Sequence, residues 1–179
     1  MTSTLIERWI PDPPRVKDDL EGLGGILHAC VHAGGSVSFV LPFSPDDATV
    51  FWREQVLPAV HAGSRCVLLA RIGDRLVGTV QLDLDTPPNQ PHRAEVKKLL
   101  VHPEARRRGI ARALMNEVEE EARASGRTLL TLDTVTGGFA EPLYRSLGYM
   151  TVGVIPRYAL NFNSTALEAT TVMYKEIAP

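Results

Sequence analysis

Long hydrophobic runs are missing from this sequence, and no segment approaches the roughly 20 apolar residues needed to cross a bilayer. Only two cysteines occur among 179 residues, which excludes a disulfide-rich scaffold and predicts that Cys30 and Cys66 are reduced core residues. Neither sign of charge dominates, because 19 Lys and Arg stand against 21 Asp and Glu. Basic residues cluster only at 106–108, so we expect no nucleic-acid surface.

The first ten residues do not have the pattern of a secretory signal. They include Glu7 and Arg8 and are followed by Pro11, so they lack an apolar central stretch. We therefore expect a cytoplasmic protein with no membrane partner. The length fits a single domain, residues 1–179, with room for a substantial core.

Hydrophobic periodicity and turn residues predict an alternation of strands and helices. The order predicts an α/β fold with a mixed sheet, a parallel pair formed by 94–101 and 128–134, and a right-handed crossover between them. Ligands gather beyond the carboxyl ends of such a pair, here near Val101 and Asp133. Strands are expected at 5–10, 65–72, 76–84, 94–101, 128–134, 149–158 and 170–177, helices at 16–33, 45–61, 110–124 and 139–147, a short extended stretch at 39–41, and a long loop at 156–169.

Three glycines interrupt the predicted helix 16–33. Gly22, Gly24 and Gly25 each weaken a helix by about 1 kcal/mol relative to alanine. A helix loosened in this way is a candidate functional segment.

The segment 94–111 is the most informative part of the chain. A strand rich in Val and Leu ends at Val101, a loop follows, and an amphipathic helix begins at Ile110. The first N–H groups of such a helix have no partners within the helix, so an anion placed there is stabilised. Gly109 allows close approach of the backbone, and three arginines add positive charge. The pattern indicates a pyrophosphate site, although a solvated basic helix turn is the alternative.

Arg106-x-x-Gly109-x-Ala111 resembles the (Gln/Arg)-x-x-Gly-x-(Gly/Ala) motif of the GCN5-related N-acetyltransferase (GNAT) superfamily. A second segment, 140–149, resembles that superfamily's helix, glycine and strand signature with its tyrosine. The resemblance covers about residues 4 to 177. It implies a GNAT fold with a mostly antiparallel sheet and a splayed central parallel pair, acetyl-CoA as co-substrate and no metal. It also implies the residues that contact the cofactor, namely Leu99, Leu100, Val101, Arg106, Arg107, Arg108, Gly109, Ile110, Ala111 and Tyr144.

Segments 32–39, 93–99 and 129–134, together with Ala140-Glu141 and Tyr144, are similar to one branch of the superfamily, the tabtoxin resistance acetyltransferases. That similarity implies a small amino-acid-like amine as acceptor, of the toxin or antibiotic resistance type, and it is compatible with a homodimer. One departure is clear. Many members place an asparagine where this chain has Gly137, so a side-chain contact to the cofactor is missing or replaced.

Three residues are candidates for the chemistry of acetyl transfer. The resemblance implies that Tyr144 protonates the leaving thiolate, with an ordinary core tyrosine as the alternative. Glu95 and Asp133 are carboxylates on the central strands and are candidate bases that bind the acceptor amine. For Glu95 the alternative is an ion pair with Lys97 or Arg93, and for Asp133 a turn or cap at the strand end.

His32 and Ser36 are candidate residues of the substrate wall, and a surface histidine and a turn serine explain them equally well. Two other functions stay open. A peptide or protein N-terminal acetyltransferase needs an open groove, which the loop 156–169 would close or line. A non-catalytic acyl-CoA sensor on the same fold would be expected to lack the tyrosine, whereas Tyr144 is present.

Overall fold

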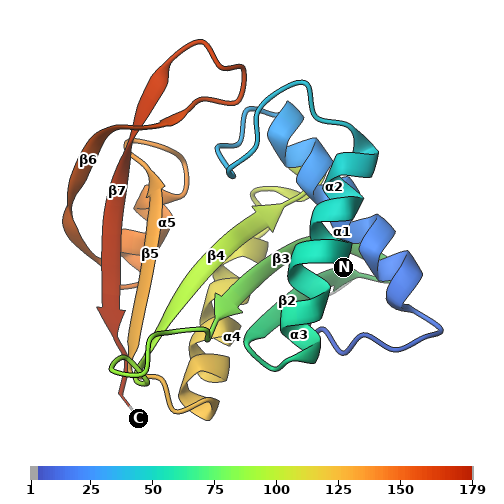
Figure 1. Ribbon diagram of the computed structural model, residues 1–179, viewed down its shortest axis with the longest axis horizontal. Coiled ribbons are helices and arrows are strands. Elements are labelled where there is room, and N and C mark those ends of the chain that lie inside the picture. Colours follow the sequence, from blue (N-terminus) through green and yellow to red (C-terminus); the bar gives the residue numbers. More distant parts are fainter. Residues whose placement is uncertain (1–3, 179) are drawn as a thin grey trace.

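A seven-stranded sheet carries the fold, in the order β1-β2-β3-β4-β5-β7-β6 (Figure 1). The computed structural model describes residues 4–178. The strands are β1 Thr4–Arg8, β2 Arg65–Ile72, β3 Arg75–Asp83, β4 Arg93–Val101, β5 Leu129–Val135, β6 Met150–Leu160 and β7 Leu167–Glu176. The helices are α1 Val16–His32, α2 Pro45–Phe51, α3 Leu57–His61, α4 Ile110–Ala124 and α5 Glu141–Ser146.

The predicted mixed sheet with one parallel pair is confirmed, because β4 and β5 run parallel and the other neighbours are antiparallel. β4 and β5 pair only at their first residues, Arg93–Glu95 with Leu129–Thr131. Beyond that point the two strands separate (Figure 1). A bulge at Lys98, whose φ is 50°, accompanies the separation, since Lys97 pairs with Gln81 whereas Leu100 pairs with Thr79.

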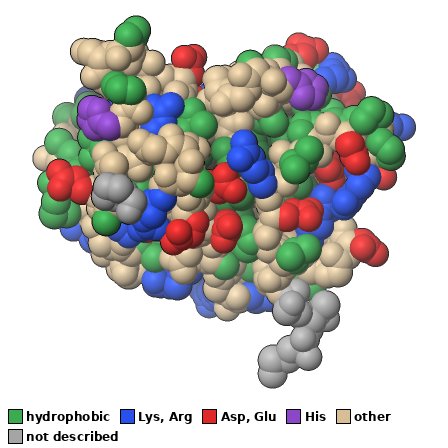
Figure 2. Space-filling view, turned by 90° about the horizontal axis from the view of Figure 1, so that it is seen from below, with side chains coloured by type: hydrophobic (Ala, Val, Ile, Leu, Met, Phe, Trp, Pro, Cys, Tyr) green, Lys and Arg blue, Asp and Glu red, His purple; other side chains and the backbone are tan. Residues whose placement is uncertain are grey.

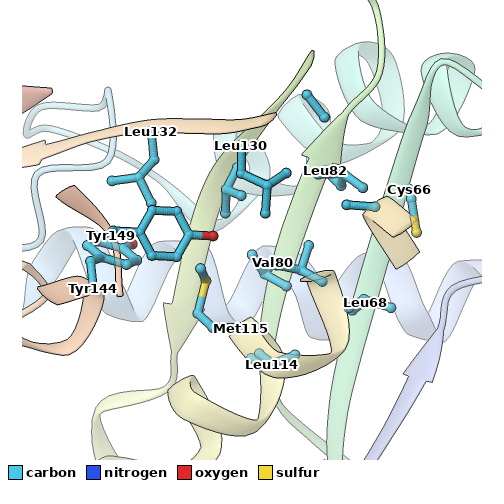
Figure 3. Close-up of a cluster of buried hydrophobic side chains, with 14 of the residues drawn as sticks. Cys66, Leu68, Val80, Leu82, Leu114, Met115, Leu130, Leu132, Tyr144 and Tyr149 are labelled. Carbon is cyan, nitrogen blue, oxygen red and sulfur yellow. The ribbon is translucent and has the colours of Figure 1, made fainter. Parts of the chain in front are cut away.

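Helices cover the two faces of the sheet unequally. α4 and α5 lie on one face, over a cluster that includes Leu114, Leu130 and Tyr144 (Figure 3). α1 and α2 lie on the other, over a cluster to which the sheet contributes residues of β2, β3 and β4. Within residues 4–178, no residue of β5, β6 or β7 belongs to that second cluster. The face of β5 that carries Asp133 is therefore not covered by α1 and α2.

One glycine of α1, Gly24, allows close packing against another helix, which corrects the interpretation of a loosened helix. α1 runs without interruption, and Gly24 is buried against α2. A Cβ atom at Gly24 would lie 2.5 Å from Thr49 Oγ1 and 3.2 Å from the Thr49 backbone. Tertiary packing therefore outweighs the low helix propensity of glycine at this position.

The long loop and one helix differ from the prediction. β6 runs through Pro156 and β7 begins at Leu167, so the long loop expected at 156–169 is only 161–166. A proline is tolerated here because β6 is the edge strand of the sheet. The predicted helix 45–61 is divided by a π-helical turn, Trp52–Val56, which precedes Pro58, a residue with no N–H to donate.

The surface agrees with the balanced composition. Figure 2 shows basic and acidic side chains intermixed over the face seen from below. Among the residues that the structure describes, no helix has the length and apolarity of a membrane span. Cys30 and Cys66 are buried and free, as predicted.

Candidate active site

The loop before α4 presents a row of free backbone donors. Among the described residues, the N–H groups of 107–112 meet no acceptor. The backbone curls because Arg107 and Gly109 have φ values of 62° and 78°. Successive N–H groups in such a turn form a concave anion site, and the helix dipole adds positive potential. This arrangement suits a pyrophosphate.

A pocket of about 220 Å³ lies at this loop, between the end of β4 and Leu143 of α5. Ile110 and Ala111 line it together with Gly109, and a Cβ atom added at Gly109 would meet no atom within 4 Å. The backbone is therefore directly accessible to a ligand at this point.

The three arginines of the loop differ in what they contact. Arg106 Nε donates to the Val101 carbonyl oxygen at 3.3 Å, and its Nη2 lies 3.9 Å from Cys30 Sγ. Arg106 thus fastens the loop to the end of β4 and to α1. The side chains of Arg107 and Arg108 are exposed and have no hydrogen-bond partner within residues 4–178, so both can reach a phosphate.

The edge of β4 that faces β5 is the second candidate cofactor element. Leu100 and Val101 pair with β3 on one side. On the other side no strand pairs with β4 beyond Glu95. Backbone groups of this edge beyond Glu95 are thus available to an extended, amide-containing chain such as pantetheine, except for the Val101 carbonyl oxygen, which accepts from Arg106.

Tyr144 lies on α5, which begins with Glu141 and Pro142 in its first turn, where a missing N–H costs nothing. The tyrosine is 6% exposed, and its ring meets the edge of Tyr149 at 5.8 Å between centroids. Its hydroxyl makes no hydrogen bond within the described chain. Burial, and then the negative charge of Asp133, raises the pKa of Tyr144 well above 10, so the group is protonated at neutral pH.

Gly137 occupies the position at which many members of the superfamily have an asparagine. Its N–H donates to Glu141 Oε2 at 2.7 Å, and the same carboxylate accepts from Arg145 at 2.6 Å. The connection from β5 to α5 is thus fixed by a glutamate that begins the helix. A side chain at Gly137 would also be strained, since its φ is 73°.

The two candidate carboxylates differ in their partners. Glu95 lies 3.3 Å from Lys97 Nζ, the ion pair considered as its alternative role, and Lys97 also contacts Asp83 at 2.8 Å. Asp133 is exposed, and its Oδ2 accepts from the Thr170 hydroxyl at 2.8 Å. No cation lies within ion-pair distance of Asp133 in the part of the chain that is described.

His32 and Ser36 lie at the end of α1 and in the loop after it, and both are exposed. His32 stacks on His28 at 4.0 Å between centroids, and its Nδ1 lies 3.0 Å from the His28 carbonyl oxygen. The structure gives neither residue a contact with Glu95 or Asp133 in the described range.

Sequence reasoning missed Lys98. Its Nζ donates to Ser38 Oγ at 2.8 Å and lies 5.7 Å from the ring centroid of Phe39. Burial, and then the positive charge of Lys97, lowers the pKa of Lys98 to about 8, although Asp133 acts in the opposite direction. The sequence offers one signal for Lys98, a lysine within an apolar strand. That pattern also fits a lysine that faces solvent, so it did not single out the residue.

Two loops meet above the separating strands. The N–H of Leu41, in the segment between α1 and α2, donates to the carbonyl oxygen of Phe162 in the β6–β7 loop at 2.7 Å. A Cβ atom on Gly34 would lie 3.6 Å from the Phe162 ring. These segments approach each other across the opening between β4 and β5 (Figure 1).

A splayed parallel pair, a donor-rich loop at a helix N-terminus and a buried tyrosine on the next helix define an acyl-CoA-dependent acetyltransferase. Residues 36–149, more than half of the chain, match the acetyltransferase (GNAT) family. The chain belongs to that family and is an N-acetyltransferase that uses acetyl-CoA.

The chain is 33% identical over 117 residues to an N-acetyltransferase, described as uncharacterized, from the hisH-hisA intergenic region of Azospirillum brasilense. That match covers 64% of this chain and 67% of the relative. Matches to two further curated relatives cover only 40% and 58% of those proteins.

Solved structures share the fold at low identity. An N-acetyltransferase from Staphylococcus aureus Mu50 matches with a TM-score of 0.79 and 16% identity, over 97% of this chain and 98% of its own. The acetyltransferase yncA from Salmonella typhimurium, determined with its cofactor acetyl-CoA, matches with a TM-score of 0.72 and 17% identity, over 97% and 94% of the two chains.

Proposed function

We propose that this enzyme acetylates a small, amino-acid-like amine by direct transfer from acetyl-CoA in a ternary complex. The observation that carries the proposal is the hydrogen bond between Leu41 and Phe162. An extended peptide substrate requires a groove that is open at both ends. A bridge across the opening between β4 and β5 favours a short acceptor instead.

Cofactor binding is assigned to the two elements with free backbone groups. The pyrophosphate binds the N–H groups of 107–112, and Arg107 and Arg108 add charge. The pantetheine arm lies along the free edge of β4 at Leu99–Val101. One N–H of this edge polarises the thioester carbonyl and stabilises the oxyanion that forms during transfer.

Asp133 and Tyr144 carry the proton transfers. The amine nitrogen attacks the thioester carbonyl carbon, a C–N bond forms, and the C–S bond breaks. The amine proton passes to Asp133, directly or through a water, and the leaving thiolate takes a proton from Tyr144. Solvent then removes the proton from Asp133 and returns one to Tyr144. Asp133 is preferred over Glu95 as the base because Glu95 is already paired with Lys97 at 3.3 Å.

Two other functions are weaker. Peptide acetylation conflicts with the Leu41–Phe162 bridge, and a sensor that binds acyl-CoA without catalysis leaves the buried Tyr144 hydroxyl with no role. The similarity of segments 32–39, 93–99 and 129–134 to tabtoxin resistance acetyltransferases supports an amino-acid-like acceptor.

Release of the CoA thiol tests the proposal directly. Purified enzyme with acetyl-CoA is screened against free amino acids, simple amines and short peptides. We expect free amino acids or close analogues to give the highest kcat/KM. In Asp133→Asn, activity at pH 7 should fall by roughly 10²-fold and recover partly at higher pH, where the amine deprotonates unaided. Glu95→Gln is the matched carboxylate control and should retain more activity. Preference for peptides would overturn the proposal.

A further inference from the structure

Lys98 is a half-buried cation on the part of β4 that has separated from β5, and within residues 4–178 it has no anionic partner. The bulge in β4 turns its side chain toward the loop after α1, where Ser38 Oγ accepts one hydrogen bond at 2.8 Å. An ammonium has three N–H donors. Within residues 4–178 no carboxylate lies within 4.0 Å of Lys98 Nζ, so two donors have no charged acceptor.

The rings around Lys98 favour its charged form. Nζ lies 5.7 Å from the ring centroid of Phe39 and 5.9 Å from that of Phe51, distances at which a cation interacts with an aromatic ring. With a pKa of about 8, the group is protonated at neutral pH in spite of its burial. A desolvated cation of this kind is stabilised further by a bound anion.

Two opposite charges lie on the two strands that separate beyond Glu95. Lys98 belongs to β4 and Asp133 to β5, and the charge of Asp133 acts on Lys98. Three other charges also act on Lys98, those of Glu95, Lys97 and Arg65. Each of them is already in an ion pair, because Lys97 contacts both Glu95 and Asp83, and Arg65 contacts Asp83. The pair of Lys98 and Asp133 is thus the one left to bind a zwitterion.

We propose that Lys98 binds the carboxylate of the acceptor and so selects amino acids over amines that lack one. The inference rests on the proposed function, because it assumes a small acceptor beside Asp133. In this arrangement the α-ammonium approaches Asp133 and passes one proton through it to solvent before attack. The neutral amine then attacks, Asp133 takes the second proton as described above, and the α-carboxylate accepts hydrogen bonds from Lys98. Lys98 acts on binding and orientation and takes no part in proton transfer.

The experiment compares the amino acid that the screen ranks first with its carboxamide, which keeps the amine and loses the negative charge. We expect the wild type to prefer the acid. Lys98→Met should lower kcat/KM for the acid roughly ten- to hundredfold, the usual cost of a charged hydrogen bond, mainly through KM. For the carboxamide the change should stay within about threefold.

Controls separate this role from a structural one. Ser38→Ala removes the hydrogen bond that ties Lys98 to the loop but keeps the ammonium, so it should preserve the preference for the acid. Unchanged acetyl-CoA affinity in calorimetry shows that Lys98→Met keeps the cofactor site. Equal effects of Lys98→Met on acid and carboxamide mean that Lys98 only supports the fold.

The wild type supplies a test that needs no variant. If it acetylates acid and carboxamide equally well, the role of Lys98 is refuted while the proposed function stands. If only peptides are acetylated, the proposed function fails, and the inference about Lys98 fails with it.

Discussion

Gly109→Ala tests the proposed pyrophosphate site, and Gly126→Ala serves as its structural control. Gly109 has φ of 78°, where an alanine costs roughly 1–2 kcal/mol, and its added Cβ would meet no protein atom within 4 Å. Gly126 has φ of 70° and equally open surroundings, but it follows the far end of α4, about 22 Å away along a 15-residue helix. Both substitutions should therefore destabilise the fold by the same amount.

Only the substitution at Gly109 should affect cofactor binding. Gly109 lines the pocket at which, under the proposal, the N–H groups of 107–112 reach the phosphates. Loss of one charged hydrogen bond costs about 1.5–3 kcal/mol, or roughly 10- to 150-fold in CoA affinity. Calorimetry measures that affinity, and thermal melts should show both variants lowered by about 2–8 °C.

Two results would refute this reasoning. If folded Gly109→Ala bound CoA with wild-type affinity, the assignment of the pyrophosphate to this loop would be wrong. An equal loss in Gly126→Ala would show that strain in α4, rather than a blocked pocket, weakens binding. Gly109→Val, whose branched side chain extends further into the pocket, should bind more weakly still.

Two further predictions concern titrating side chains. Tyr144→Phe should lower kcat by about 10²-fold with little change in acetyl-CoA affinity, because the protonated hydroxyl of Tyr144 donates to the leaving thiolate. A kcat within about threefold of the wild type would show that Tyr144 is a packing residue only. Because burial lowers the pKa of Lys98 from 10.5 to about 8, the unfolded chain binds more protons between those values, and stability rises with pH there. Denaturant unfolding should show the wild type gaining about 2 kcal/mol relative to Lys98→Met between pH 7 and about 9.5, whereas a pH-independent difference between the two proteins would contradict the lowered pKa.

The strand, loop and helix around residues 106–111 could be predicted from the sequence because their signals are local. A helix N-terminus always has free N–H groups, and a glycine with arginines beside it marks the turn, so 106–111 needs no tertiary contact to be recognised. The order of strands and helices likewise follows from periodicity, which is why the parallel pair of β4 and β5 was predicted correctly.

Other features depended on contacts between distant segments. Gly24 weakens α1 in isolation but admits α2 at close range, and the residues around Pro156 form a strand because the sheet edge tolerates a proline.

The surroundings of Glu95 and Lys98 were decided by tertiary structure. The amino-acid sequence by itself determined the order of the elements and the free N–H groups before α4. Tertiary structure set the bulge that turns Lys98 toward Ser38, the pairing of Glu95 with Lys97 rather than Arg93, and the bridge from Leu41 to Phe162. Each joins side chains or backbone groups whose proximity arises only when the sheet assembles, because hydrogen bonds and ion pairs depend on distance in space rather than along the chain.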